Sequence, residues 1–238
     1  MAFAFDNEFE NVVQIKVIGV GGGGGNAVNR MISSDIRGVE FVTVNTDIQA
    51  LKKSMATEKI QIGTKLTHGL GAGGKSEVGE SSAQENKEEI AEALKDADMV
   101  VITAGMGGGT GTGAAPVVAE ISRELGKLTI AVVTKPFGFE GAKKMAQAER
   151  GIQELLKNVD SLIVIPNQKL LTGEQKLTMR QAFSLSDGIL KTGVMSVADI
   201  ILRNGVVNVD FADVTSILKD AGYAHIAIGH GEGKDKAQ

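Results

Sequence analysis

The sequence contains no cysteine, which excludes disulfide bonds and metal sites built from thiolates. It also lacks any apolar run of about 18 residues, so it predicts no membrane-spanning helix. Basic residues are in the minority: 25 Lys and Arg against 29 Asp and Glu give a formal net charge of −4, which argues against a general nucleic-acid-binding surface. Residues 1–10 lack the basic stretch that opens a signal peptide, and we expect 1–12 to form a disordered tail. These absences predict a cytoplasmic protein that neither inserts into a membrane nor binds nucleic acid.

What the chain does contain is an alternation of apolar strands and helices. Of its 238 residues 42% are hydrophobic, enough for a substantial core. The runs typical of strands lie at 15–20, 39–45, 59–62, 99–104, 128–133 and 161–165. The segments typical of helices lie at 26–33, 77–94, from 114 onward, 139–157, 177–204 and 214–221. This alternation predicts an α/β fold with a Rossmann-like parallel sheet, helices on both faces and a long central helix.

The central glycine-rich segment is Gly107-Gly108-Gly109-Thr110-Gly111-Thr112-Gly113, which follows one of those strands. It precedes a predicted helix that has Pro116 near its first turn. Glycine lets a backbone present its N–H groups closely to a ligand, and a helix N-terminus adds partial positive charge. The two threonines add hydroxyl donors. This combination predicts a phosphate-binding loop, because a flexible linker has no reason to lie between a buried strand and a helix.

Other polar segments also lie near the ends of predicted strands. They are Gly21–Asn26, Asn45–Asp47, Gly69–Ser76, Pro136–Glu140 and Asn167. The carboxyl ends of parallel strands meet at one edge of a sheet, so we expect these segments to form a single site. Separate glycine-rich loops at that edge indicate a ligand held from two sides. A nucleoside di- or triphosphate has the right length and charge.

The long helix predicted over 177–204 begins near this edge. There Phe183 can stack on a base, and Asp187 can accept from the N1–H and exocyclic amine of guanine. Taken alone, Phe183 fits core packing equally well, and Asp187 fits a solvated helix charge. Asp210 and Asp213 follow the other end of the helix, up to about 40 Å away. They cannot serve the same molecule's nucleotide and, taken alone, are typical of a helix cap.

Several of these motifs occur together, in this order and spacing, in one family. The segment Gly107–Gly113 matches the signature of the tubulin/FtsZ superfamily, and Gly205-x-x-Asn208-x-Asp210 matches its catalytic-loop motif. The motifs Gly-Gly-Gly-Gly-Gly-Asn, Asn-Thr-Asp, Pro-Phe-x-Phe-Glu-Gly and Asn-Val-Asp-Phe-Ala-Asp agree as well. The similarity runs over about 15–231, and the chain therefore resembles the FtsZ family, the GTPases of bacterial cell division.

The resemblance implies GTP or GDP with Mg²⁺ as ligands, and head-to-tail filaments at the division site. The nucleotide-binding candidates are Gly22, Gly23, Gly24, Gly25, Asn26, Asn45, Asp47, Ala72, Gly73, Gly107, Gly108, Gly109, Thr110, Gly111, Thr112, Pro136, Glu140, Lys144, Asn167, Phe183 and Asp187. Among them the resemblance assigns Gly22, Gly23, Asn26 and 109–111 to the phosphates. It assigns Glu140 to the ribose, and Asn167, Phe183 and Asp187 to guanine.

The resemblance also implies how the site is completed. Asn208, Asp210 and Asp213 of one subunit would complete the site of the next and position the attacking water beside Mg²⁺. The expected partners are therefore another copy of this chain, a full-length family member, and division proteins of the family. We predict no metal site formed by protein ligands alone.

The resemblance further divides the chain into parts. We expect a GTP-binding domain over 13–176, the central helix over 177–204, and over 205–238 the catalytic loop with the start of a truncated second domain. Lys144 stands where the family usually has Arg, so this position offers one point charge in place of the planar fork of a guanidinium group. Gln168 stands where the family usually has Asp. Because most of the second domain is missing, we expect tight GTP binding with weak filaments and low GTPase activity.

Other interpretations remain open. The segment Gly69–Ser76 fits the P-loop pattern G-x-x-x-x-G-K-[ST], but residues 64–68 before it are too polar for the buried strand that a P-loop needs. Gly19-x-Gly21-x-x-Gly24 fits a dinucleotide fingerprint, which leaves the second glycine-rich loop without a role. A further possibility is a nucleotide-binding protein that has lost turnover and filament formation.

Overall fold

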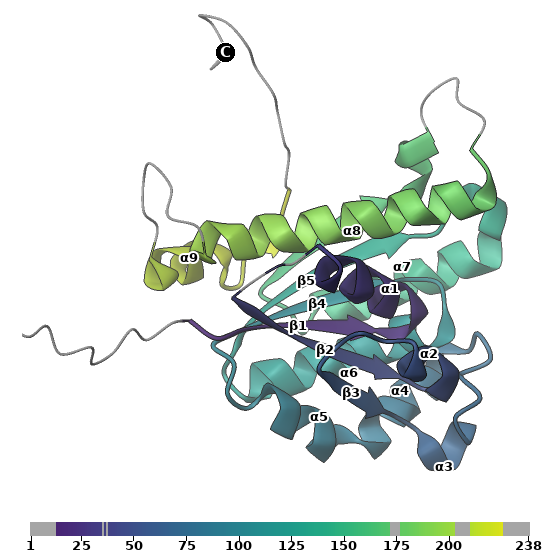
Figure 1. Ribbon diagram of the computed structural model, residues 1–238, viewed down its shortest axis with the longest axis horizontal. Helices are drawn as coiled ribbons and strands as arrows, with labels where there is room; N and C mark the ends of the chain where they lie inside the picture. The colour runs from purple at the N-terminus through teal and green to yellow at the C-terminus, as the bar shows by residue number, and fades with distance from the viewer. Residues whose placement is uncertain (1–12, 35, 37, 172–176, 203–209, 226–238) are drawn as a thin grey trace, which may run out of the picture.

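A computed structural model describes residues 13–34, 36, 38–171, 177–202 and 210–225. Its centre is a seven-stranded sheet in the order β3-β2-β1-β4-β5-β6-β7 (Figure 1). The strands are β1 Ile15–Val20, β2 Val39–Asn45, β3 Glu58–Gln61, β4 Met99–Gly105, β5 Leu128–Lys135, β6 Ser161–Pro166 and β7 Gly222–Tyr223. Every pairing between neighbouring strands is parallel. The predicted Rossmann-like α/β sheet is confirmed.

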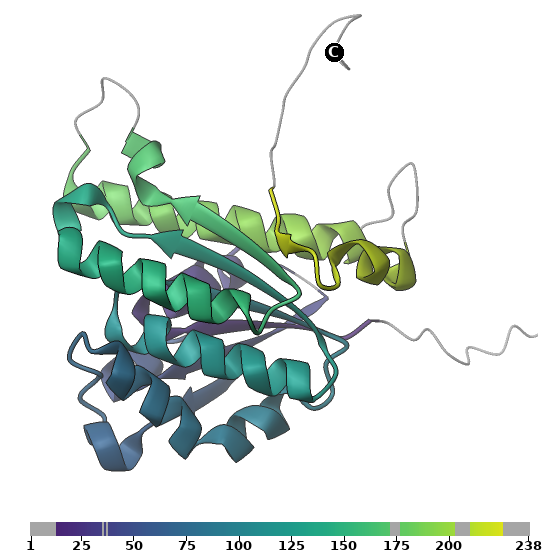
Figure 2. The same cartoon turned by 180° about the vertical axis from the view of Figure 1, so that it is seen from behind.

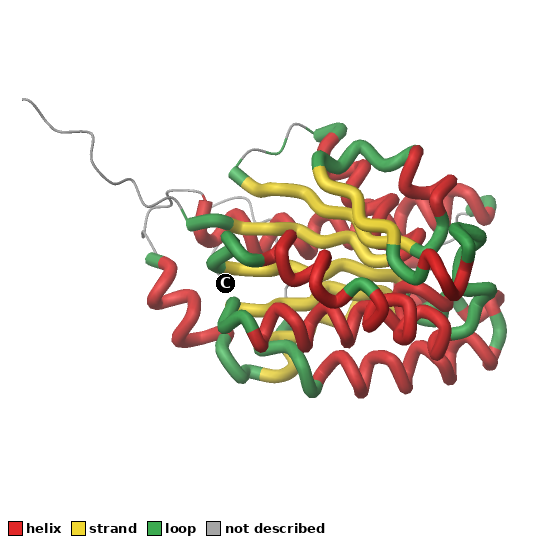
Figure 3. Tube along the Cα trace, turned by 90° about the horizontal axis from the view of Figure 1, so that it is seen from below, coloured by secondary structure: helices red, strands yellow, loops and turns green. Residues whose placement is uncertain are grey.

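Helices cover both faces of this sheet, as Figures 2 and 3 show. The helices are α1 Gly21–Ile32, α2 Ile48–Lys52, α3 Thr64–Thr67, α4 Ser76–Glu85, α5 Lys87–Leu94, α6 Gly109–Glu124, α7 Ala142–Leu156, α8 Met179–Leu202 and α9 Phe211–Leu218, with 3₁₀ turns η1 Gly138–Glu140 and η2 Asn167–Leu171. One core cluster joins the sheet to α1 and α8, and the other joins it to α4, α5, α6 and α7. Because both faces are covered, β1 is buried along its whole length, and Lys16 is its one charged residue. None of the described helices is long and apolar enough to cross a membrane.

Both glycine runs differ from the prediction, because they are helical. Helix α1 begins at Gly21, and α6 begins at Gly109, so neither run is a loop along its whole length. Pro116 consequently lies inside α6 and not in its first turn. The physical reason is close packing: a Cβ at Gly113 would overlap the carbonyl oxygen of Ser76 at the start of α4. Tertiary contact with α4 thus overrides the weak helix propensity of glycine.

Two predicted helices are interrupted. The segment 77–94 forms α4 and α5, which are separated at Asn86, whose Oδ1 accepts a hydrogen bond from the Gly63 N–H at 2.9 Å. The segment 139–157 forms the η1 turn and α7, which are separated by Gly141 with φ 97°. The long helix predicted over 177–204 is confirmed as α8, which has 24 residues.

The chain after α8 returns to the sheet. Asp210 caps α9, and its Oδ1 accepts from the Asp213 N–H at 2.8 Å. Beyond α9, Gly222 and Tyr223 pair in parallel with Ser161 and Leu162 of β6. These two residues therefore extend the seven-stranded sheet. The division of the chain into domains stays a prediction.

The contrast between two helical glycines gives a stability test. Gly113→Ala should destabilise the fold by roughly 1–3 kcal/mol, because the added methyl group overlaps the α4 backbone. Gly188→Ala in α8 is the matched control: its Cβ meets nothing within 4 Å, so alanine should stabilise by about 0.5–1 kcal/mol. Urea denaturation of both variants measures the difference, and equal midpoints would contradict the close α4–α6 packing.

Candidate functional site

The candidate site lies where the strand order reverses. Strands β1 and β4 are neighbours, and Val20 at the end of β1 pairs with Ala104 near the end of β4. Helices α1 and α6 start directly beyond these ends, so close together that a Cβ on Gly21 would lie 2.7 Å from the Gly111 nitrogen. Crevices at such switch points bind ligands in open α/β sheets. Two helix N-termini here present unpaired N–H groups and partial positive charge to one place, which suits an anion.

The glycines of this edge divide into two groups by the direction in which a Cβ would point. At Gly24 a side chain would overlap the carbonyl oxygen of Thr103, and at Gly109 it would lie 2.8 Å from the Ala72 Cβ. These positions serve packing of protein on protein. At Gly22, Gly25 and Gly108 a Cβ would meet nothing within 4 Å. These three positions face open space and leave room for a ligand beside the backbone.

One face of α1 connects this edge with α8. Gly22, Asn26 and Arg30 follow one another at intervals of four residues, and all three are exposed. A cavity of about 270 Å³ is lined by Gly22, Gly25 and Asn26 together with Asn45 and Asp47. A second cavity, of about 640 Å³, is lined by Asn26 and Arg30 together with Asp187. Asn26 belongs to both, so the hollow is continuous over about 12 Å of helix.

The α8 end of this hollow carries a partly buried carboxylate. Asp187 Oδ2 lies 3.3 Å from Arg30 Nε, and Arg30 Nη2 donates to Ser184 Oγ at 2.9 Å. Burial raises the pKa of the Asp187 carboxyl above its usual value, and the hydrogen bond and charge of Arg30 oppose this shift. Sequence analysis missed Arg30. Its position one helical turn beyond Asn26 was the available signal.

Asn167 and its neighbour Gln168 connect other loops to this end. Asn167 is buried, and its Oδ1 accepts from Ser186 Oγ at 2.8 Å, so its Nδ2 group can donate to a ligand. Gln168 Oε1 accepts from the Gly138 N–H at 2.9 Å. Gln168 therefore ties the η2 turn to the η1 turn through this hydrogen bond.

An aromatic cluster borders Asn167. The rings of Phe137 and Phe139 stack with centroids 5.0 Å apart, and Phe183 stands edge-on to them at 5.5 and 6.1 Å. Phe183 remains 40% exposed, so it is not a core residue and a face of its ring is available for stacking. The packing interpretation of Phe183 explains only its edge contacts.

The predicted ribose contact is held within its own loop. Glu140 Oε1 accepts from the Phe137 N–H at 2.9 Å, and Oε2 lies 3.2 Å from Lys144 Nζ. Lysine at this position thus pairs with Glu140 through one point charge. Pro136 is buried, and its Cγ would lie 2.6 Å from a Cβ on Gly107, so it packs beneath the glycine loop.

The two threonines differ from expectation. Thr110 Oγ1 lies 2.7 Å from Thr46 Oγ1, and both side chains are buried. Thr112 is only 2% exposed, and its hydroxyl accepts from the Gly107 N–H at 2.8 Å. The geometry therefore does not support hydroxyl donation from Thr112 to a ligand; this side chain holds the loop in shape.

The loop after β2 carries Asn45 and Asp47. Asn45 Oδ1 accepts from the Asp47 N–H, and Asp47 Oδ1 caps α2 by accepting from Gln49 and Ala50. The neighbouring segment 69–76 follows α3 and not a strand, and this rules out the P-loop interpretation. Gly73, unlike Ala72, is exposed and open around its Cα.

Two of the three predicted catalytic residues, Asp210 and Asp213, are not beside this hollow. The third, Asn208, lies outside the described residues. Asp210 and the exposed Asp213 lie at the start of α9. In Figure 1, α9 is at the left end of α8, whereas the strand arrows point to the right. The 24 residues of α8 correspond to about 36 Å, so these carboxylates cannot reach a ligand on their own molecule's edge.

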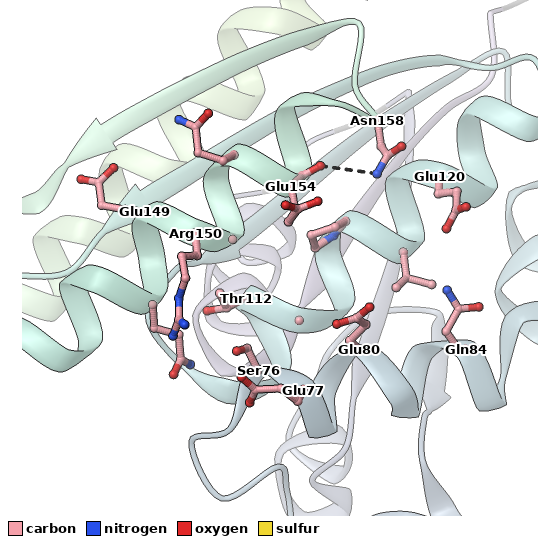
Figure 4. A pocket seen from close by; sticks show the side chains of 16 residues that line it. Ser76, Glu77, Glu80, Gln84, Thr112, Glu120, Glu149, Arg150, Glu154 and Asn158 are labelled. Carbon is pink, nitrogen blue, oxygen red and sulfur yellow. Dashed lines mark hydrogen bonds between the residues drawn. The ribbon is translucent and has the colours of Figure 1, made fainter.

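Another cavity of similar size lies elsewhere. It measures about 650 Å³ and lies between α4, α6 and α7, where Figure 4 shows Glu77, Glu80, Glu120, Glu149 and Glu154 around it. A nucleotide's phosphates would be repelled by these carboxylates, so the α1 hollow is the better candidate. Within the described part of the chain, no group of three or more His, Cys, Asp or Glu is placed to hold a metal ion.

Comparison with known proteins decides the family. Residues 14–174 match the family model described as Tubulin/FtsZ family, GTPase domain. The chain belongs to the tubulin/FtsZ family. An FtsZ W319Y mutant of M. jannaschii is 46% identical, with a TM-score of 0.90 over 94% of this chain and 68% of that one. An empty FtsZ dimer of the same organism is 46% identical, with a TM-score of 0.86 over 89% of this chain.

More distant members share the fold. A GTPγS-bound protofilament of CetZ2 from Haloferax volcanii is 24% identical and has a TM-score of 0.74, over 89% of this chain and 64% of that one. The present chain spans only 62% of the length of the FtsZ dimer subunit that it matches. Family membership excludes the dinucleotide-dependent oxidoreductase interpretation, because the matched domain is a GTPase domain.

Substitutions in α1 test the location of the phosphate site. Gly22→Ala places a methyl group in open space beside the hollow, so folding should be unaffected while nucleotide affinity falls at least about tenfold. Gly24→Ala is the contrast: it should lower the melting temperature, because its Cβ overlaps the β4 backbone. Calorimetric titration with GDP and thermal melting of both variants give the two readouts. Normal GDP binding by Gly22→Ala would place the phosphates elsewhere.

Proposed function

We propose that this chain binds GTP and GDP with Mg²⁺ and hydrolyses GTP as a filament-forming protein of cell division. The observation that carries the proposal is the hollow along α1, which connects the start of α1, directly beside the start of α6, to the Asp187 carboxylate. The helix starts suit phosphates, and the carboxylate suits a base with two adjacent donors. The GTPase-domain match over 14–174 supports the same assignment.

The guanine end combines three side chains. The Asp187 carboxylate accepts from N1–H and the exocyclic amine, and the free donors of Asn167 face the acceptors of the base. Phe183 supplies an exposed ring for stacking. Adenine lacks the N1–H, so its N1 lone pair would face the Asp187 carboxylate without a hydrogen bond, which costs affinity at a partly buried site.

The phosphate end uses backbone groups more than side chains. The N-termini of α1 and α6 hold the chain of phosphates, with Ala72 and Gly73 on the outer side. Mg²⁺ bound to nucleotides keeps most of its water and needs only one or two protein carboxylates, so the absence of a three-ligand cluster among the described residues suits it. Asp47, which lines the smaller cavity, offers such a carboxylate. The ion supplies charge stabilisation at the transferring phosphoryl group.

Hydrolysis is proposed to occur between two subunits. The carboxylates of Asp210 and Asp213, with Asn208, would dock on the nucleotide edge of the next molecule and orient the attacking water. Head-to-tail stacking then repeats along a filament, at the division site. An alternative is a nucleotide-binding form with little turnover and no filaments.

Guanine selectivity should depend on the ionisation of Asp187. At neutral pH the ionised carboxylate should give GTP at least a tenfold preference over ATP. Burial raises the pKa of Asp187 above that of an ordinary aspartate, which is about 3.9. On acidification the preference for GTP should therefore be lost at a higher pH than an ordinary aspartate would give. Competition titrations across pH measure this. Asp187→Asn should show a weak preference that no longer varies with pH, and equal GTP and ATP affinities in the native protein would refute the assignment.

Turnover should need two subunits. GTPase activity per molecule should rise with protein concentration, in parallel with sedimentation, because activation of water typically contributes about 10²–10⁴-fold in rate. A full-length family member should raise the turnover of this chain by donating its acidic loop. The matched control is the same protein with Asp→Ala at the position corresponding to Asp213, which should not. Activity that is independent of concentration would exclude the shared site.

A further inference from the structure

One buried side chain joins the two phosphate-side loops from behind. Gln147 of α7 is 8% exposed, and it lines the 650 Å³ cavity between α4, α6 and α7 (Figure 4). Its Nε2 donates to the Gly108 carbonyl at 2.8 Å and to the Gly74 carbonyl at 3.1 Å, with the Gly107 carbonyl at 3.4 Å. Three converging carbonyl oxygens require the –NH₂ group on this side, which fixes the orientation of the amide.

These bonds determine where the loop N–H groups point. In a trans peptide the C=O and the following N–H point in opposite directions, and no described peptide is cis. Drawing the carbonyls of Gly107 and Gly108 toward α7 therefore turns the N–H groups of Gly108 and Gly109 away from α7. Gly108 is also open where a Cβ would project, with no atom within 4 Å. The Thr112 hydroxyl holds the preceding N–H, that of Gly107, from the inside.

The same amide also fixes the outer loop. Gly73 and Gly74 have φ of 59° and 76°, and a Cβ on Gly109 would lie 3.0 Å from the Lys75 nitrogen, so this loop touches the start of α6. The two cavities connect Asp187, at the proposed base end, with Asn26 and then with Gly22. The start of α6 comes next, and the 72–75 loop comes last. The 72–75 loop is the part farthest from the base, where the terminal phosphate of the longest nucleotide would lie.

We propose that Gln147 is a positioning residue that sets the preference of this site for GTP over GDP. The inference rests on the proposed nucleotide site. By tying the 72–75 loop to the start of α6, Gln147 keeps the backbone groups of both loops preorganised for a third phosphate. Nucleotides that end at the second phosphate use mainly the starts of α1 and α6, so their affinity depends less on Gln147. Preorganisation of this kind contributes to affinity without direct contact between the residue and the ligand.

The test compares two glutamines on the same helix. Gln147→Leu keeps the volume and removes the donors; Gln153→Leu makes the same change at an exposed position that lines the same cavity. We expect Gln147→Leu to lower GTP affinity roughly tenfold, the scale of one or two hydrogen bonds, and GDP affinity clearly less. Gln153→Leu should leave both affinities unchanged. Titrations with GDP and with a non-hydrolysable GTP analogue, both with Mg²⁺, provide the ratio.

Several outcomes would overturn the proposal. Equal losses of GDP and analogue affinity, accompanied by a lower melting temperature, would assign Gln147 a structural role only. Unchanged affinities would remove any role in binding. Gln147→Met is a second variant for the case in which Gln147→Leu does not fold. If both variants unfold, Gln147 has only a structural role. If the native chain binds neither nucleotide, the proposed function itself is wrong. If the native chain binds both and Gln147→Leu leaves the ratio of GTP-analogue to GDP affinity unchanged, only this inference is wrong.

Discussion

The close approach of two helix starts at the β1–β4 boundary is the constraint on which the rest of the site depends. Gly21 and Gly111 come so near that a Cβ added to Gly21 would collide with the backbone nitrogen of Gly111. The reversal of strand order places the β1 and β4 ends side by side, and glycine allows both following helices to begin there without a gap. The result is one region of unpaired N–H groups in place of two separate helix ends. Every later element is arranged around that region.

The long α8 then separates binding from the acidic groups. Its N-terminal part carries Phe183 and Asp187 beside α1, and its other end leads to Asp210 at the start of α9. A rigid rod of about 36 Å cannot fold back on itself. The geometry therefore keeps Asp210 and Asp213 away from the candidate hollow of their own molecule, which is what the proposed two-subunit site requires.

Polar side chains that never face the hollow set its shape. Thr112 holds a loop N–H, Gln147 holds loop carbonyls, and Gln168 accepts from the Gly138 N–H. Each makes a hydrogen bond that a glycine-rich backbone cannot supply from its own secondary structure. Loops with so few side chains have a large conformational entropy to lose, and these contacts limit it before a ligand arrives. Thr112 of α6 and Gln147 of α7 act from the face of the sheet opposite α1.

The sequence by itself determined the fold class and indicated the edge of the sheet where the candidate site lies. Apolar strands and strand-end glycines are local patterns, and a parallel sheet brings such ends together whatever the details. Only the tertiary structure decided that the glycine runs are helical, because packing against α4 and β4 outweighs propensity. Likewise, Arg30 beside Asp187, Thr112 beneath Gly107 and Gln147 across two loops depend on contacts between distant segments. No periodicity encodes such contacts, since each is fixed by how whole helices dock on the sheet.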